Sequence, residues 1–208
     1  MSTPSIRRLA AILIADVVGY SRMMERDEPG THGRVARIRA EVTDPAVLRH
    51  GGRVVRSVGD GFLVEFPSAV SALEAAIEIQ RAMADRNRAV STHERIDHRI
   101  GINLGDILVD EHDIAGTGVN VAARLEALAP PGGIAVSATV REQVRQNLGI
   151  RFIDGGEHRV KNISRPVRVF HVGLDGAAPQ APARTGRGRR WAAAALVLLA
   201  VFAGSWFT

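Results

Sequence analysis

The sequence predicts an α/β (α+β) fold in which helices pack on a mixed β-sheet. Apolar runs rich in Ile, Leu and Val alternate along the chain with segments of helical spacing. Gly59-Asp60-Gly61 separates two short apolar runs, which is a hairpin signal because Gly and Asp tolerate positive φ. Of the 208 residues, 46% are hydrophobic and 24% are charged, which is typical of a globular domain and excludes a disordered chain.

The first half of the chain contains five predicted elements. The run Leu9–Ala15 predicts a buried strand, and residues 31–48 predict a helix closed by His50-Gly51-Gly52. Residues 53–58 and 62–66 predict the two strands of the hairpin. Residues 68–83 predict a helix, since Ala72, Ala76, Ile79 and Met83 share one side.

The second half repeats the alternation. Residues 95–104 and 107–109 predict a strand pair broken at Gly105-Asp106, and residues 117–128 predict a helix that ends before Pro130-Pro131. Residues 134–137 predict a strand and residues 138–148 a helix. The stretch from there to about residue 172 predicts further β structure.

Composition and charge exclude several classes of function. The chain has no cysteine, so any metal is held by oxygen or histidine. Four arginines lie after residue 175, where no acidic residue occurs, so the net charge of +5 leaves residues 1–175 nearly neutral. This argues against a nucleic-acid-binding face. No G-x-x-x-x-G-K-[ST] motif occurs, which excludes a P-loop NTPase.

The composition changes near the C-terminal end. Residues 174–190 are rich in Ala, Pro, Gly and Arg, which predicts a flexible linker. Residues 191–207 carry no charge, follow an arginine cluster and have Trp near both ends, which predicts a single transmembrane helix with the preceding domain in the cytoplasm. A buried helix or a cloning remnant is the alternative interpretation of this segment.

Two aspartates are candidates for metal binding. Asp16 ends an otherwise apolar strand, where an unpaired charge is costly, and Asp60 sits at the tip of the hairpin. If the two strands are neighbours, both carboxylates reach one divalent cation or two, and hard oxygen ligands suit Mg²⁺ or Mn²⁺. By itself, Asp60 is better explained as an ordinary turn residue.

The predicted helix 117–128 carries a polar pair. Asn120 and Arg124 are four residues apart, about 40° around the helix, so they project together while Val121, Leu125 and Leu128 face the core. Arginine suits the charge of phosphate oxygens in a transition state. A solvated helix face explains the pair alone equally well.

Several stretches, in order, resemble the class III adenylyl/guanylyl cyclase catalytic domain, of the bacterial, membrane-linked type. The resemblance covers about residues 7–173. It is carried by AILIADVVGYSRMM, RVVRSVGDGFLVEF, RIGINLGDILVD, DIAGTGVNVAARLEALA and VKNISRPVRVF. It implies a ferredoxin-like βαββαβ core and conversion of ATP to 3′,5′-cyclic AMP and pyrophosphate.

The resemblance also implies a role for each candidate residue. Asp16, Asp60 and the Val17 carbonyl would bind two Mg²⁺ or Mn²⁺ ions. Asn120 would orient the ribose, and Arg124 would stabilise the transition state at the α-phosphate. Lys161, the one lysine of the chain, would contact the terminal phosphates.

Two positions would read the base. Asp113 matches the family aspartate that accepts from the adenine amino group, and Arg56 stands where adenylyl cyclases usually have lysine. Because arginine is bulkier and forked, this departure bears on rate and on nucleotide preference. In this family the metal aspartates come from one subunit and the base-reading and Asn/Arg residues from the other, so a homodimer with two equivalent sites is implied.

Two alternatives remain within the resemblance. A degenerate cyclase domain would bind nucleotide or a regulatory partner without turnover, and Arg56 is among its few supports. A guanylate cyclase would have Glu in place of the base-reading lysine and Cys or a similar residue in place of the aspartate, a pattern that Arg56 and Asp113 fit poorly.

Overall fold

The computed structural model describes residues 6–110, 113–144, 150–159 and 166–174. It contains one sheet of eight strands in the order β2-β3-β1-β4-β6-β8-β7, with β5 paired to β4. The strands are β1 (Ile6–Val17), β2 (Arg53–Val58), β3 (Gly61–Phe66), β4 (His98–Val109), β5 (Ile114–Ala115), β6 (Ile134–Ser137), β7 (Phe152–His158) and β8 (Val167–Val172). The helices are α1 (Tyr20–Arg26), α2 (Glu28–Ile38), α3 (Asp44–Arg49), α4 (Ala69–Arg88), α5 (Thr117–Leu128) and α6 (Ala138–Val144).

The first four strands form the ferredoxin-like core that the resemblance implies. The antiparallel order β2-β3-β1-β4, with helices between β1 and β2 and between β3 and β4, is the βαββαβ arrangement. Strand β4 then pairs in parallel with β6, which extends the sheet towards β8 and β7. The sheet is therefore mixed, as predicted.

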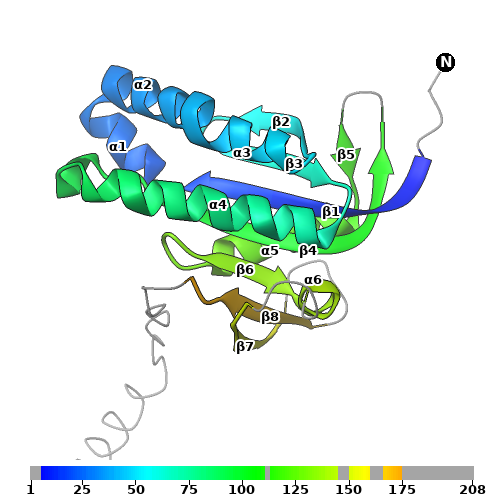
Figure 1. Cartoon of the computed structure of the whole chain (residues 1–208). Coiled ribbons are helices and arrows are strands. Elements are labelled where there is room, and N and C mark those ends of the chain that lie inside the picture. Colours follow the sequence, from blue (N-terminus) through cyan, green and yellow to red (C-terminus); the bar gives the residue numbers. More distant parts are fainter. Residues whose placement is uncertain (1–5, 111–112, 145–149, 160–165, 175–208) are drawn as a thin grey trace, which may run out of the picture.

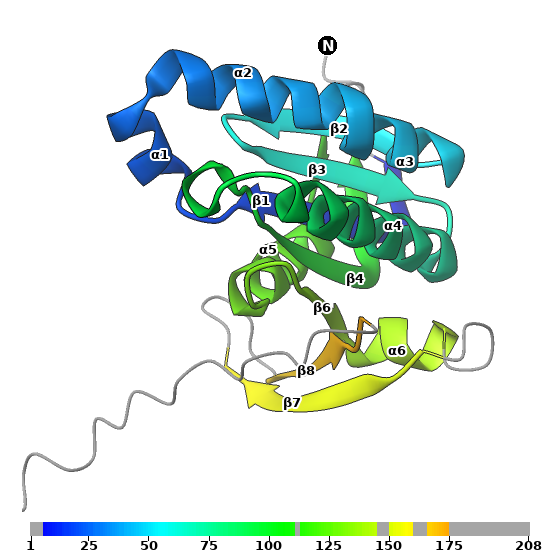
Figure 2. The same ribbon diagram turned by 60° about the vertical axis from the view of Figure 1, so that its left-hand side comes forward.

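The helices divide between the two faces of the sheet (Figures 1 and 2). Helices α2, α3 and α4 cover one face, where Leu13, Ala15 and Val64 pack with Leu73 and Ile79 of α4. Helix α5 lies on the opposite face, where its Ala122 packs with Ile12 and Leu63. Successive residues of a strand point to opposite faces, so β1 contributes alternate residues to the two cores.

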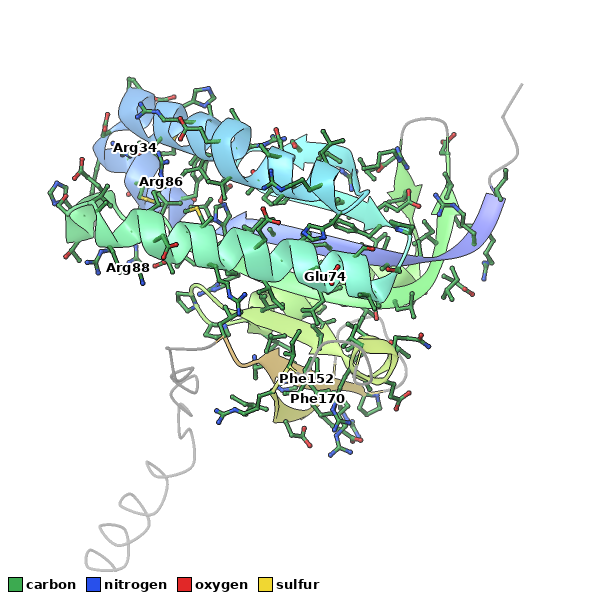
Figure 3. All side chains as sticks on the ribbon, viewed as in Figure 1. Arg34, Glu74, Arg86, Arg88, Phe152 and Phe170 are labelled. Atoms are coloured by element: carbon green, nitrogen blue, oxygen red, sulfur yellow. The ribbon has the colours of Figure 1, made fainter. Side chains whose placement is uncertain are left out.

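The helix predicted over residues 31–48 is present as an unbroken helical stretch from Glu28 to Arg49, but its middle turn is π-helical. Helix α2 begins at Glu28, capped by the Asp27 side chain, and a π-helical turn, Arg39–Thr43, separates it from α3. Pro45 at the start of α3 donates no backbone hydrogen bond, and its ring clashes with a regular α-helical turn. Arg86 of α4 donates to Glu41 of the widened turn at 3.0 Å (Figure 3).

The break predicted at Gly105-Asp106 is wrong. Strand β4 is continuous from His98 to Val109, and β1 pairs with it from Val17↔His98 to Ile6↔Val109. Gly105 therefore lies within the strand and not in a turn. An added Cβ at this position would lie 3.3 Å from the Gly118 Cα of α5. Glycine at this position lets α5 pack close to the strand. The sequence pattern alone does not distinguish such a glycine from one in a turn.

The other predicted elements are present, with small changes at their ends. The hairpin, the helix 117–128 and the strand 134–137 match, and the helix predicted over 68–83 extends to Arg88. Helix α6 is described to Val144, so residues 145–148 of its predicted range lie outside the described residues.

The described part of the chain contains no helix long and apolar enough to cross a membrane. The predicted linker over 174–190 lies outside this part except for Leu174, and the predicted membrane segment over 191–207 lies outside it entirely. Both remain predictions.

Helix α5 sits unusually close to β4. At Gly101 an added Cβ would lie 2.1 Å from the Glu126 backbone nitrogen and 2.4 Å from the Ala122 carbonyl oxygen. The buried Asn103 side chain donates to the Gly118 carbonyl at 3.1 Å, which fixes the start of the helix. These contacts set where every side chain of α5 lies relative to the sheet.

We expect Gly101→Ala to displace α5 and lower the free energy of unfolding by about 3 kcal/mol, because backbone atoms cannot yield to the added methyl group. The matched control is Gly33→Ala, at an exposed position inside α2 where a Cβ meets nothing within 4 Å. The control is expected to keep or raise stability by up to about 1 kcal/mol. Urea unfolding followed by circular dichroism measures both, and equal effects would contradict this account of Gly101.

Candidate active site

Asp16 and Asp60 meet at one end of the sheet, as the sequence predicts. Strand β1 lies beside β3 with Ala15 opposite Phe62, so the β2–β3 turn stands next to the end of β1. The turn holds Gly59 at φ 61°, and the Asp60 Oδ2 accepts a hydrogen bond from the Val17 backbone N–H at 3.2 Å. The two carboxyl groups are also hydrogen-bonded to each other.

Burial, followed by the hydrogen bond to Asp60 and the Asp60 charge, raises the pKa of Asp16 to about 6. Arg99, which lies opposite Asp16 in the β1–β4 register, acts in the other direction. Two carboxylates held this close repel each other unless they share a proton or a cation. The pair therefore fits a divalent cation, and the Val17 N–H orients one of its members.

Asn120 and Arg124 lie on the exposed side of α5, while Val121 and Leu125 are buried. Asn120 lines the cleft between α5 and the sheet, whereas Arg124, one turn further along, projects into solvent. The helix face that carries them is thus not buried within its own protomer.

Arg56 and Asp113, 57 residues apart in the chain, form an ion pair. The Arg56 Nη1 donates to the Asp113 Oδ2 at 3.0 Å, and the Asp113 Oδ1 accepts from the Ile114 backbone N–H at 2.8 Å. The backbone contact anchors the carboxylate at the start of β5. Both side chains remain about half exposed, so each keeps hydrogen-bonding capacity for a ligand.

A cleft of about 410 Å³, within the usual size range for small-molecule sites, is lined by one member of each pair: Asp16, Arg56 and Asn120. It lies on the α5 side of the sheet. Its lining joins polar groups to an apolar wall and consists of Ile14, Ala15, Asp16, Arg56, Gly61, Phe62, Leu63, Val119, Asn120, Ala123 and Glu126.

Sequence reasoning missed Glu126 and Arg99. Burial, with smaller contributions from the Asp16 and Asp60 charges, raises the pKa of Glu126 to about 7, and the Arg99 charge acts in the opposite direction. The Arg99 Nε is buried without a hydrogen-bond partner among the described residues. The signal that was available is a charged residue inside an apolar element, Arg99 in HRIGIN and Glu126 in ARLEAL.

Lys161 lies outside the described residues, so its contact with phosphate stays a prediction. Within the described residues, no three His, Asp or Glu side chains converge closely enough to ligate one metal ion together. Of the candidate metal ligands, Asp16 and Asp60 are the two carboxylates that the structure brings together.

The fold is that of a nucleotidyl cyclase catalytic domain. Residues 6–172 match the model of the adenylate and guanylate cyclase catalytic domain family, and the chain belongs to that family. The resemblance seen in the sequence is thereby confirmed.

Individual relatives point to cyclases as well. The chain is 54% identical over 171 residues to a protein of Rhizobium meliloti (strain 1021) named "Putative adenylate cyclase 3", covering 82% of this chain and 29% of that protein. It is 29% identical over 141 residues to an adenylate cyclase of Streptomyces coelicolor, covering 67% of this chain and 35% of that protein. The chain thus spans about a third of the length of these relatives.

Among solved structures, an adenylate/guanylate cyclase/hydrolase from Silicibacter pomeroyi superposes with a TM-score of 0.78 at 47% identity, covering 83% of this chain and 100% of that one. The adenylyl cyclase CyaB from P. aeruginosa superposes with a TM-score of 0.73 at 24% identity, over 86% of this chain and 100% of that one. The second likeness concerns the fold alone.

The raised pKa of Asp16 predicts a pH-dependent effect of Asp16→Asn in metal-free protein. The folded-state pKa is about 6 and the ordinary value is 3.8, so the native protein holds this proton more tightly. The resulting stabilisation is complete below pH 3.8 and is lost as pH rises through 6. Because asparagine has no charge to bury, the variant should gain stability relative to wild type as pH rises.

At pH 8 we expect a gain of about 1 kcal/mol after solvent screening, or roughly 3 °C in Tm, and little gain at pH 4. Thermal unfolding with EDTA present measures the difference between the two proteins at each pH. A difference in Tm that does not change with pH would contradict the assignment.

Proposed function

We propose that this domain is an adenylate cyclase, which converts ATP to 3′,5′-cyclic AMP and pyrophosphate at a homodimer interface with two divalent cations. The observation that carries the proposal is that one protomer presents both halves of a shared site: the Asp16–Asp60 carboxylates, and the Arg56–Asp113 pair with Asn120 and Arg124 on an exposed helix face. Family membership supports the same chemistry.

Asp16 and Asp60 would hold Mg²⁺ or Mn²⁺, together with the Val17 carbonyl. Bound there, the ions would lower the pKa of the ribose 3′-hydroxyl and neutralise charge on the triphosphate. The Val17 N–H keeps the Asp60 carboxylate in place, and Arg99 beside Asp16 favours its ionised form. Both effects prepare the pair for a cation in place of a proton.

Asn120 and Arg124 would act on the nucleotide held by the partner protomer. Their exposure supports this, since an arginine that leaves its own cleft is available to another chain. Asn120 would orient the ribose, and Arg124 would stabilise the charge that develops at the α-phosphate as the 3′-oxygen attacks and pyrophosphate leaves. Lys161 would bind the terminal phosphates.

The Arg56–Asp113 pair favours adenine over guanine. Adenine presents an amino donor next to a ring acceptor, which matches a carboxylate next to a guanidinium. Guanine places a carbonyl acceptor where adenine has the amino group, and that oxygen would face the Asp113 carboxylate. Arg56 therefore serves as the donor that lysine supplies in related cyclases.

The dimeric site predicts complementation between inactive variants. Asp60→Ala and Arg124→Ala should each lower turnover on the order of 10³-fold while leaving the dimer folded. After the two variants are co-expressed, half of the dimers are mixed and each mixed dimer holds one intact site, so about a quarter of wild-type activity should return. Cyclic AMP formation measures it, and no recovery with mixed dimers present would contradict the shared site.

Base selection is tested with Arg56→Lys. The variant should keep or raise the ratio of kcat/KM for ATP over GTP, because lysine retains the donor while losing the bulk of the fork. Wild type and variant are assayed with Mn²⁺ and each nucleotide side by side. A shift towards GTP would show that Arg56 does not read adenine, and ATP binding without any cyclic product would favour a degenerate domain.

A further inference from the structure

Glu126 is a charged side chain without an assigned role in the cleft. It lies on α5 and lines the same cleft as Asp16. Within the described part of the chain its carboxylate has neither a hydrogen bond nor an ion pair, although the residue is only partly exposed. Partial burial of a carboxylate that has no hydrogen bond is costly, and a nearby cation would offset that cost.

The placement of Glu126 is rigid. Its backbone nitrogen would lie 2.1 Å from a Cβ on Gly101, so β4 and α5 are in direct backbone contact at this point. Gly101 pairs with Ile14 of β1, two residues before Asp16 and on the same face of the sheet. The close approach therefore carries Glu126 down to the carboxylate pair instead of out into solvent.

The charges around Asp16 do not balance without a cation. Asp16, Asp60 and Glu126 act on one another electrostatically, and Arg99 is the cation that acts on both Asp16 and Glu126. When all four are ionised they sum to a net charge of −2, which matches one divalent ion. Arg99 is thus insufficient by itself to compensate the three carboxylates.

We infer that Glu126 is a third acidic residue of the metal centre, one that attracts the cation from beyond its direct ligands, through water, in the same protomer as Asp16. The inference rests on the proposed metal-dependent function. Direct ligation is not required, in keeping with the absence of a converging three-residue ligand set among the described residues. Such outer carboxylates commonly contribute about 10- to 100-fold to metal affinity.

The first test is Mn²⁺ binding to the purified dimer without nucleotide, followed by electron paramagnetic resonance of the free ion. Glu126→Gln should weaken binding about tenfold. Glu142→Gln, the same change on the exposed surface of α6, should leave binding unchanged. Glu126→Asp, which keeps the charge on a shorter side chain, should fall between wild type and Glu126→Gln.

Thermal unfolding distinguishes loss of the ion from loss of the fold. Metal-free Glu126→Gln should unfold at the wild-type temperature or above it, since the substitution removes a buried charge. Unchanged Mn²⁺ affinity in this variant overturns the inference while the proposed function stands. If Asp16→Asn also leaves Mn²⁺ binding at the wild-type level, the metal centre itself is refuted and Glu126 with it.

The second test asks in which protomer Glu126 acts, and it uses mixed dimers of Asp60→Ala and Arg124→Ala chains. Their intact site takes its carboxylates from the Arg124→Ala chain. Glu126→Gln added to that chain should raise the Mn²⁺ concentration for half-maximal activity about tenfold. The same substitution on the Asp60→Ala chain should leave that concentration unchanged, and the reverse pattern would contradict the assignment.

Discussion

The contact between α5 and β4 is the constraint on which the candidate site depends. Gly101 removes the side chain that would hold the helix away, Gly105 does the same near the start of the helix, and Asn103 ties the Gly118 carbonyl to the strand. With the helix backbone against the sheet, Val121 and Leu125 fill the core while Asn120 and Glu126 reach the cleft. A larger residue at position 101 would move both functional side chains together.

This geometry also leaves the negative charges around the cleft poorly compensated by positive charges of the protein itself. The β1–β3 pairing brings Asp60 to Asp16, and the helix brings Glu126 to both, against Arg99. Sites of this kind give up some stability of the empty protein in exchange for affinity towards a cation. The Arg56–Asp113 pair is different, since each partner compensates the other before any nucleotide arrives.

The chain belongs to the adenylate and guanylate cyclase family and spans about a third of the length of two curated relatives that it matches. Much of the site could be predicted from sequence, because its motifs recur in order at family spacing. Glu126 and Arg99 could not, because a lone charge in an apolar element has the same pattern whether it faces solvent or a cleft. The partners of each charge depend on which elements pack together.

By itself, the sequence determined the alternation of strands and helices, the hairpin that presents Asp60, and the helix that presents Asn120 and Arg124, since all of these follow from local periodicity and turn chemistry. It did not determine that Gly105 admits a helix and that β4 runs on unbroken, or that the helical stretch before Arg49 contains a π-helical turn at Arg39–Thr43. Only the tertiary structure decided these, and with them the meeting of Arg56 with Asp113 and of Glu126 with Asp16. The reason is physical: such contacts join residues far apart in the chain, and their energy depends on the distance between elements, which no local pattern encodes.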